Sequence, residues 1–208
     1  MKLYYSPGTC SLSPHIVARE AGLPIELVKV DIRRIPHRSE DGADYAAAVT
    51  AKGYVPALEL DDGGLLTEGA AIVQYLADRA PESGLAPAWG TMGRYRLIEW
   101  LNFVASELHK VFSPWLFHPE YGRQAAEVAR DKLAGRLAFV DAQLAGRPYL
   151  LGEAFTVADA YLFTIAGWTR ITGIDTAPWP NLEAFLQRVA ARPAVRSAMQ
   201  AEGLLLAA

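Results

Sequence analysis

The single cysteine of the chain, Cys10, occupies a position at which a thiolate would be stabilised. It ends the turn Ser6-Pro7-Gly8-Thr9-Cys10, between a predicted strand and a predicted helix, where free amides and the positive end of the helix dipole gather. The C-x-x-S segment that begins at Cys10 lacks the resolving cysteine of a redox pair, so a disulfide would need an outside thiol such as glutathione. The competing interpretation is an inert packing residue, because free cysteines are among the most buried residues.

A second group of polar residues recurs along a segment that is otherwise apolar. Asn102, Ser106 and His109 are spaced i, i+4 and i+7, within about 60° of one another on a helix, with Lys110 beside them. The pattern indicates either a ligand site or a hydrogen-bonded network. Aromatic residues that would line an apolar acceptor pocket, or else belong to the core, are Tyr5, Phe112, Trp115 and Trp168.

Two short motifs in the first half of the chain give weaker signals. Glu68-Gly69 opens a predicted helix, so a carboxylate and exposed amides lie together, which suits a ligand with both an ammonium and a carboxylate group. Acidic residues there are also common as helix caps. Val55-Pro56 enters a predicted strand through proline, where a cis peptide bond is an option, although only about 5–6% of such bonds are cis.

Composition and charge exclude several classes of function. The chain has 20 Lys and Arg against 23 Asp and Glu, so it lacks the positive charge that a nucleic-acid partner requires. No apolar run approaches the roughly 18 residues of a membrane span, and the N-terminus lacks a secretory pattern, so we expect a cytoplasmic protein with no membrane partner. The histidines show no metal-ligand spacing among themselves or with Cys10, so no metal site is predicted.

Two regions of different pattern must position these residues. Residues 1–80 alternate short strands with helices and predict an α/β domain. Residues 81–90 are rich in Pro, Gly and small residues and predict a linker, and residues 91–208 predict an all-helical domain. The predicted strands are Lys2–Tyr5, Ile25–Asp31, Ala57–Leu60 and Leu65–Thr67. The predicted helices are 14–21, 70–80, 92–112, 124–144, 156–171, 181–191 and 194–202.

Three local patterns have structural rather than chemical interpretations. Ser13 before Pro14 predicts the N-cap of the first helix. Thr156 and Asp159 have the spacing of a capping box, which accounts for both polar residues without catalysis. The basic run at 33–38 predicts a solvated, mobile loop.

Together these segments resemble the cytosolic glutathione transferase superfamily and, within it, the bacterial beta class. The resemblance runs from end to end and is carried by residues 1–15, 55–58, 66–76, 99–110 and 155–163. It implies a thioredoxin-like N-terminal domain that binds glutathione, a helical-bundle C-terminal domain that forms the acceptor pocket, and a homodimer. It also implies glutathione as co-substrate and a detoxifying activity on apolar electrophiles.

The resemblance further implies roles for individual residues. Cys10 matches a cysteine that faces the glutathione sulfur and can form a mixed disulfide with it. Val55, before a cis-proline at Pro56, would pair its backbone with the cysteinyl part of glutathione. The remaining glutathione-binding residues would be Tyr5, Lys52, Glu68 and Gly69 in the first domain and Asn102, Ser106, His109 and Lys110 in the second. His109 joins Cys10 as a catalytic residue, and Tyr5, Phe112, Trp115 and Trp168 would form the acceptor pocket.

The chain departs from the family pattern in two places. The loop at 33–45 differs in length and sequence where a lysine often contacts glutathione, so the contact to the glycyl end stays unassigned and only Lys52 is nearby. Thr50-Ala51 stands where Asn-Pro is usual. The functions considered are conjugation of the glutathione thiolate, thiol–disulfide exchange or peroxide reduction through Cys10, a non-catalytic interaction module and, least favoured, isomerisation of a cis-dienoic acid.

Overall fold

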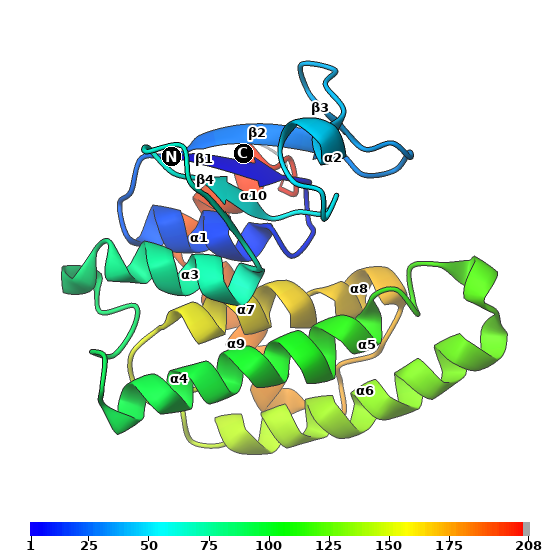
Figure 1. Ribbon diagram of the computed structural model, residues 1–208. Coiled ribbons are helices and arrows are strands. Elements are labelled where there is room, and N and C mark those ends of the chain that lie inside the picture. Colours follow the sequence, from blue (N-terminus) through cyan, green and yellow to red (C-terminus); the bar gives the residue numbers. More distant parts are fainter. Residues whose placement is uncertain (206–208) are drawn as a thin grey trace. The chain divides into compact units, whose positions relative to one another are not determined.

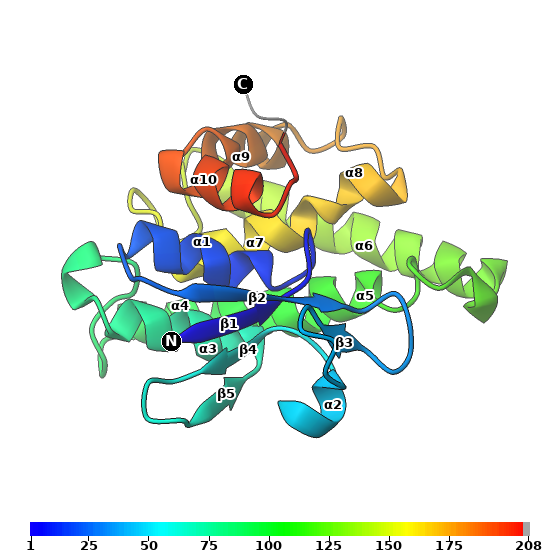
Figure 2. The same ribbon diagram turned by 90° about the horizontal axis from the view of Figure 1, so that it is seen from above.

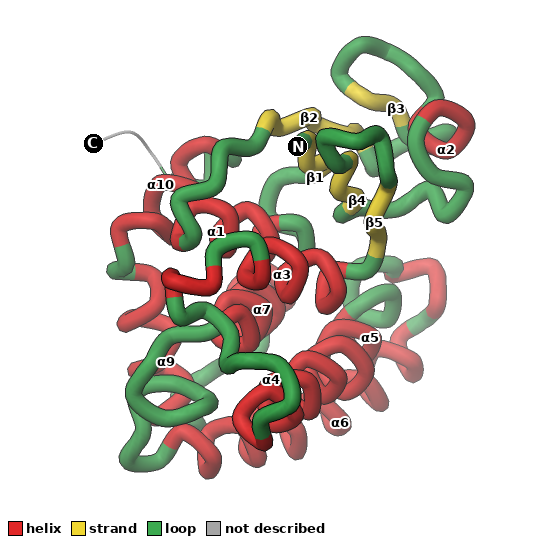
Figure 3. Tube along the Cα trace, turned by 60° about the vertical axis from the view of Figure 1, so that its left-hand side comes forward, coloured by secondary structure: helices red, strands yellow, loops and turns green. Residues whose placement is uncertain are grey.

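The computed structural model describes residues 1–205, which divide into two compact units. Of the described residues, the first unit comprises 1–83 together with 192–205, and the second comprises 84–191. Among the described residues, every β-strand lies in the first unit, and the second is helical (Figure 3). No helix in the described part of the chain is both long and apolar enough to cross a membrane.

The first unit is built on one mixed five-stranded sheet with the order β3-β2-β1-β4-β5. β1 is the central strand of the sheet, because it pairs parallel with β2 on one side and antiparallel with β4 on the other. Its residues Leu3, Tyr4 and Tyr5 are buried, which explains an apolar run without alternation. The strands are β1 (Lys2–Tyr5), β2 (Glu26–Asp31), β3 (Arg38–Ser39), β4 (Ala57–Glu59) and β5 (Leu65–Thr67).

Helices α1 and α3 lie side by side on one side of this sheet (Figure 1). The helices of the first unit are α1 (Leu12–Glu20), α2 (Tyr45–Ala48), α3 (Gly69–Asp78) and α10 (Pro193–Ala201). A 3₁₀ turn, Pro81–Ser83, follows α3 in the predicted linker. The thioredoxin-like α/β fold predicted for the N-terminal region is confirmed.

The helix after Cys10 begins two residues earlier than predicted, and Ser13 is not its N-cap. Ser13 Oγ instead donates to the Cys10 carbonyl at 2.9 Å. The hydroxyl of Ser11 accepts from the Ser6 amide and donates to the Ser6 carbonyl, both at 3.1 Å. Both serines therefore bond to the turn, and Pro14 lies in the first helical turn, where its missing N–H costs nothing.

The predicted loop at 33–45 carries more regular structure than its composition indicated. β3 pairs antiparallel with β2, and α2 is capped by the carboxylate of Asp44, which accepts from the amides of Ala46 and Ala47. Tyr45 is fully buried beside Tyr4. The burial of Tyr45 fixes the segment, and the basic composition of 33–38 gives no indication of it.

The last helix, predicted at 194–202, is shifted by one residue, and it differs from prediction chiefly in its packing partner. α10 packs against α1, within the first unit, although residues 91–208 were predicted to form one helical domain (Figure 2). The Arg192 guanidinium binds both carboxylate oxygens of Glu20 at 2.6 and 2.8 Å, and Val195 and Ala198 are buried. An apolar helical face predicts that something covers it but does not say which element does.

The second unit is a helical bundle with α7 at its centre. All ten residues of α7 are buried, and it contacts α4, α9 and the π-helical segment Val104–His109. The other helices are α4 (Met92–Phe103), α5 (Lys110–Phe112), the 3₁₀ turn Pro119–Tyr121, α6 (Arg123–Leu144), α8 (Trp168–Thr172) and α9 (Pro180–Ala190). The helical C-terminal architecture is confirmed for this region.

The predicted helix over 156–171 divides at Gly167 into α7 (Val157–Ala166) and α8. A Cβ at Gly167 would lie 3.0 Å from the Phe163 carbonyl oxygen, a tight contact that would require the backbone to shift slightly. At the N-terminal end of α7, Thr156 and Asp159 form the predicted capping box. The Asp159 carboxylate accepts from the Thr156 amide and hydroxyl, each at 2.8 Å.

Candidate functional site

Cys10 lies at the end of the turn that leads from β1 into α1, and it is half-buried. Its thiol donates to the carbonyl oxygen of Val55 at 3.4 Å. The peptide bond that follows, Val55–Pro56, is cis, as the resemblance implied. The structure therefore brings Cys10 to the Val55–Pro56 segment, although Cys10 and Val55 are 45 residues apart in the sequence.

The amides that follow Cys10 are not free, which differs from the sequence-based expectation. The amide of Leu12 donates to the Thr9 carbonyl at 3.0 Å, and that of Ser13 donates to the Cys10 carbonyl at 3.2 Å. The chain turns before the helix begins, so these donors are satisfied locally. The electrostatic field of the nine-residue α1 remains directed toward the turn.

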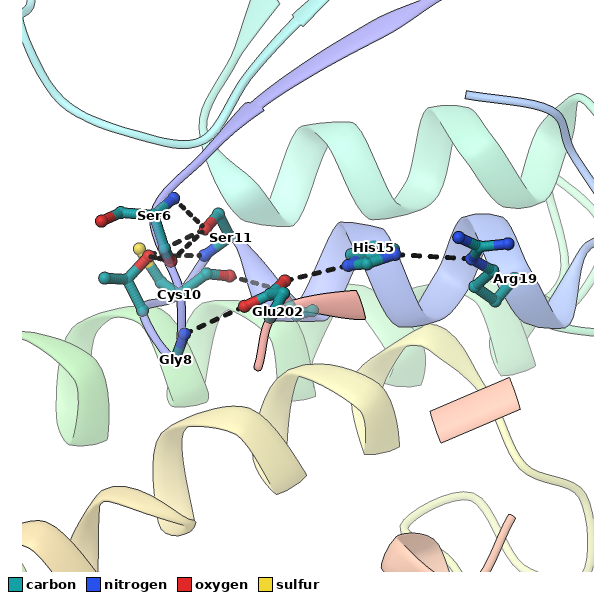
Figure 4. A network of polar contacts seen from close by, with 9 residues as sticks. Ser6, Gly8, Cys10, Ser11, His15, Arg19 and Glu202 are labelled. Atoms are coloured by element: carbon teal, nitrogen blue, oxygen red, sulfur yellow. Dashed lines mark hydrogen bonds and ion pairs between the residues drawn. The ribbon is translucent and has the colours of Figure 1, made fainter. Parts of the chain in front are cut away.

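A polar network that includes the buried side chains of His15 and Glu202 holds the turn at Ser6–Cys10 in place (Figure 4). Glu202, from the segment after α10, accepts from the Gly8 amide at 2.9 Å and meets His15 Nδ1 at 2.9 Å. Arg19 Nε donates to His15 Nε2 at 3.4 Å, which leaves Nδ1 as the nitrogen that donates to Glu202. The side chains of His15 and Glu202 are both fully buried. Sequence spacing gave no signal for this network, because Glu202 lies 194 residues from Gly8.

Glu68 lies at the start of α3 in an unusual backbone conformation. Its φ of 69° is in the left-handed region, and it is the one non-glycine residue with positive φ in the described chain. Its Oε1 accepts from Lys52 Nζ at 2.6 Å and from the Tyr54 hydroxyl at 2.8 Å. The hydrogen bond to Glu68 raises the pKa of Lys52. The structure thus joins Lys52, Glu68 and Gly69, and it adds Tyr54, which sequence reasoning missed.

Tyr5 is buried at the end of β1, and its ring lies 6.3 Å from that of His15. Burial, and then the charge of Glu202, raise the pKa of its hydroxyl. Tyr5 therefore belongs to the support of the Cys10 turn, and its predicted place in an acceptor pocket stays a prediction.

In the second unit, His109 ends the π-helical segment Val104–His109. Its Nδ1 lies 2.8 Å from the Tyr161 hydroxyl, and its ring stands edge-on to Trp168 at 5.1 Å. A π-helical turn inserts an extra residue, so residues after it are rotated relative to an α-helix. The single polar face predicted for 102–109 is therefore not retained.

The other polar residues of that face are exposed. Asn102 Nδ2 donates to the Ile98 carbonyl at 2.9 Å, and Ser106 Oγ donates to the Asn102 carbonyl at 3.0 Å. Lys110 is exposed as well. His109 is half-buried, whereas Asn102, Ser106 and Lys110 are exposed.

Trp168 is the centre of an aromatic group in the second unit. Phe112 and Phe117 stand edge-on to it at 5.9 and 5.2 Å, together with His109. Trp115 instead contacts Tyr121 at 5.8 Å. The structure therefore joins Phe112 and Trp168, adds Phe117, and places Trp115 outside the group.

No cluster of His, Cys, Asp and Glu suited to a metal ion occurs among residues 1–205. The residues that sequence reasoning missed, Tyr54, Phe117, Tyr161 and Glu202, are common types at unremarkable spacing. Only the aromatic composition of 112–121 could have drawn attention to Phe117.

The comparisons with known proteins identify the family of the chain. The family models of the N-terminal and C-terminal domains of glutathione S-transferase match residues 4–84 and 103–193. The chain is 47% identical to glutathione S-transferase GstA of Escherichia coli O157:H7 over 204 residues, which cover 98% of this chain and all of that protein.

Two solved structures are similar throughout. The ternary complex of BphK, a bacterial glutathione transferase, is 55% identical with a TM-score of 0.95, covering 98% of this chain and 100% of that one. The beta-class enzyme of Sphingomonas chungbukensis is 45% identical with a TM-score of 0.93, covering 99% and 100%. The chain therefore belongs to the glutathione transferase family, and its likeness to relatives over their full length groups it with the bacterial beta-class enzymes.

Proposed function

We propose that this glutathione transferase binds glutathione at the Cys10 side of the first unit and conjugates its thiolate to apolar electrophiles. One observation carries the proposal: the Cys10 thiol lies 3.4 Å from the carbonyl of Val55, next to a cis-proline. That carbonyl belongs to the segment just before β4, whose backbone groups would pair with the cysteinyl part of glutathione.

The γ-glutamyl end of glutathione has both an ammonium and a carboxylate group, and the start of α3 suits both. The exposed Glu68 carboxylate would receive the ammonium, and the first amides of α3, at Gly69 and Ala70, would receive the carboxylate. Lys52 and Tyr54 already hold Glu68 Oε1 in place. We therefore assign them to positioning Glu68, with the contact to the glycyl end still unassigned.

In the conjugation step, the glutathione sulfur forms a bond to an electrophilic carbon, and the leaving group departs with its electron pair. His109 and Lys110 would stabilise the thiolate before attack, and the group around Trp168 would hold the apolar acceptor. Two aromatic rings edge-on to Trp168 favour a planar, apolar electrophile.

Cys10 supports a second activity of the same site. Its thiolate would attack the glutathione sulfur of a glutathionylated substrate, forming a mixed disulfide with Cys10 and releasing the substrate thiolate. A free glutathione thiolate would then attack the glutathione sulfur of that mixed disulfide, which releases the Cys10 thiolate and forms oxidised glutathione. The half-buried Cys10, the only cysteine in the sequence, leaves no internal disulfide as an alternative.

A paired experiment on the native enzyme and Cys10→Ala tests both activities. Intact mass after incubation with oxidised glutathione reports the mixed disulfide, and the initial rate with an activated aryl halide reports conjugation. We expect an adduct of one glutathione in the native enzyme alone, with conjugation retained in Cys10→Ala. Absence of both adduct and conjugation would favour a non-catalytic interaction module instead.

We also propose a homodimer that forms through the second unit. A groove of about 920 Å³ lies along α4 and α6, and its lining includes Trp100, Phe103 and Phe139, whose rings contact one another in edge-on and tilted arrangements. Met92 and Tyr95 on α4 are also largely exposed. So much exposed apolar surface in one region is typical of an interface.

Sedimentation of Phe139→Asp tests the dimer. A charge in the groove should shift the enzyme to monomer, whereas Val128→Asp, at an exposed apolar position of the same helix, should not. A dimer that survives Phe139→Asp would place the interface elsewhere.

A further inference from the structure

The side chain of His37 joins two segments of the first unit, residues 33–45 and residues 50–54. Its Nδ1 lies 2.6 Å from the carbonyl oxygen of Gly53, and its own carbonyl accepts from the Tyr45 amide at 2.9 Å. We propose that protonated His37 binds the glycyl carboxylate of glutathione, so that the affinity for glutathione falls as pH rises. This inference rests on the proposed function and concerns the end of glutathione that has no assigned contact.

The bond to Gly53 places His37 close to the proposed glutathione site. Gly53 precedes Val55 by two residues, which span at most about 7 Å. The Val55 carbonyl, 3.4 Å from the Cys10 thiol, marks the proposed position of the cysteinyl residue. The glycyl residue is the next one in the tripeptide, so its carboxylate is within reach of the His37 ring.

The segment 50–54 has different neighbours at successive residues. Lys52 Nζ and the Tyr54 hydroxyl both bind Glu68, at 2.6 and 2.8 Å, where the γ-glutamyl end is proposed to lie. Gly53, between them, directs its carbonyl to His37. Because the cysteinyl residue is the middle of glutathione, its glycyl end extends away from Glu68, and His37 is the neighbour of the segment on the loop at 33–45.

The bond to Gly53 also fixes the state of each ring nitrogen. A carbonyl oxygen only accepts hydrogen bonds, so Nδ1 of His37 carries a proton, and Nε2 of the neutral ring is an acceptor. Nε2 has no hydrogen-bond partner among residues 1–205 and is not a buried atom, so a ligand can reach it. The residue as a whole is half-buried, which restricts the ring.

The dependence on pH follows from these two nitrogens. A carboxylate only accepts hydrogen bonds, so it gains no bond from the acceptor Nε2 of neutral His37. Protonation turns Nε2 into a donor and gives the ring a positive charge, so the hydrogen bond becomes charge-assisted. A lysine, which the family pattern often has on this loop, stays charged at neutral pH, whereas an imidazole ordinarily titrates at about pH 6.5.

Cations and carboxylates both occur around His37, and none of them pairs with its ring among residues 1–205. Asp44 caps α2, and Asp41 accepts from the Ser39 hydroxyl at 2.7 Å, so these two carboxylates have other partners. The cations on the adjoining segments are Arg33, Arg34, Arg38 and Lys52. The other ionisable groups there are Asp31, Glu40 and Tyr54. A ligand carboxylate therefore meets exposed arginines, whose charge is constant, and one fixed donor whose charge changes with pH.

Calorimetry with S-methylglutathione tests the proposal without catalysis. This ligand keeps the glycyl carboxylate, and its thioether has no thiol proton to titrate. We expect its Kd to rise roughly ten-fold between about pH 5.5 and about pH 8, because a charge-assisted hydrogen bond is lost. The glycyl ethyl ester of the same ligand lacks the carboxylate, so its Kd should stay constant over this range. The same pH dependence for acid and ester overturns the proposal.

His37→Asn separates the charge of the ring from its bond to Gly53. The side-chain amide of asparagine can donate to the Gly53 carbonyl as Nδ1 does, but it cannot become a cation. The variant should bind S-methylglutathione roughly ten-fold more weakly than the native enzyme at about pH 5.5 and equally well at about pH 8. Native affinity at the lower pH contradicts the proposal, because the arginines would then hold the carboxylate without His37.

His118→Asn is the matched control for this variant. It removes an exposed histidine that pairs with Glu120 in the second unit. Its binding of S-methylglutathione should keep the native pH dependence. Loss of the pH dependence in this control would show that it does not arise from His37 and would overturn the proposal.

Nuclear magnetic resonance of the ¹⁵N-histidine-labelled native enzyme tests the ring directly. At about pH 8, the neutral His37 should give the ring-nitrogen shifts of the Nδ1–H tautomer. Saturating S-methylglutathione should raise the midpoint of its titration by about one pH unit, which corresponds to a ten-fold preference of the ligand for the protonated ring. An Nε2–H tautomer, or a midpoint that the ligand does not move, overturns the proposal.

The binding data separate this inference from the proposed function. If acid and ester bind the native enzyme equally well at every pH, glutathione occupies the site without His37, and this inference alone fails. If the native enzyme binds neither ligand at any pH, the proposed glutathione site fails, and this inference fails with it.

Discussion

Within residues 1–205, each unit contains one carboxylate side chain that is fully buried, and the two have different partners. Glu202 in the first unit accepts from a backbone amide, that of Gly8, and faces the titratable ring of His15. Asp159 in the second unit accepts only from neutral groups, the amides of Leu150 and Thr156 and the Thr156 hydroxyl. One carboxylate joins an ionisable network, and the other stabilises a helix start.

The two also differ in how far along the chain their partners lie. Gly8 and His15 are 194 and 187 residues from Glu202, whereas Leu150 and Thr156 are nine and three residues from Asp159. A local pair can be inferred from spacing, and a distant pair cannot. The carboxylate that supports the Cys10 turn is the distant one.

The largest expected effect is that of Glu202→Ala. The substitution leaves a buried histidine and a buried amide without their acceptor, and breaking a buried pair by removing one partner costs about 3–5 kcal/mol. Urea unfolding at a fixed protein concentration measures the loss. Glu202→Gln, which keeps one acceptor oxygen, should lose less, and equal losses would mean that charge rather than hydrogen bonding matters.

Asp159→Ala should rank second. It should lower the free energy of unfolding by about 2–4 kcal/mol, because it leaves neutral donors without an acceptor at about 1–3 kcal/mol each. The same unfolding measurement applies. If Asp159→Ala proves more costly than Glu202→Ala, a local helix start contributes more stability than the link between α1 and the chain after α10, and the comparison reverses.

The pH dependence of stability further distinguishes Asp159 from Glu202. Burial raises the pKa of Asp159 from its ordinary value of 3.8 to about 6. Between these values the unfolded chain has lost the proton that the folded protein retains, so the contribution of Asp159 to stability falls as pH rises from about 4 to about 6. Stability of the native enzyme relative to Asp159→Asn should decline across that window, and a flat difference would contradict the raised pKa.

The smallest of these effects concerns the ion pair that helps attach α10 to α1. Arg192→Ala removes a two-bond contact to the partly buried Glu20 and should cost about 1–2 kcal/mol. Arg123→Ala, which breaks the exposed pair with Glu127, should cost no more than about 0.5 kcal/mol. Equal losses would show that the contact at Arg192 is no stronger than a surface pair.

Much of the fold followed from local patterns. β1 and β5 have the predicted bounds, and α6 begins one residue early because Gly122, not Arg123, precedes its first turn. The small elements at 38–48 were missed because they depend on the pairing of β3 with β2 and the burial of Tyr45. The π-helical segment was missed because apolar spacing does not distinguish an α-helical turn from one with an extra residue.

For the site, residue types and turns indicated the parts but not their contacts. The turn before a helix marked Cys10, and the helix start marked Glu68. Their partners Tyr54 and Glu202 have no distinguishing sequence pattern, because a hydrogen bond over many residues leaves no spacing to detect.

By itself, the sequence determined an α/β region followed by helices, a cysteine at the end of a turn and a self-contained cap at Asp159. These are local properties, set by turn chemistry, periodicity and the satisfaction of nearby amides. Only the tertiary structure decided that α10 packs on α1, that Glu202 supports the Cys10 turn and that His109 meets Tyr161. Those contacts depend on which distant surfaces exclude water together, and that is a property of the packed chain.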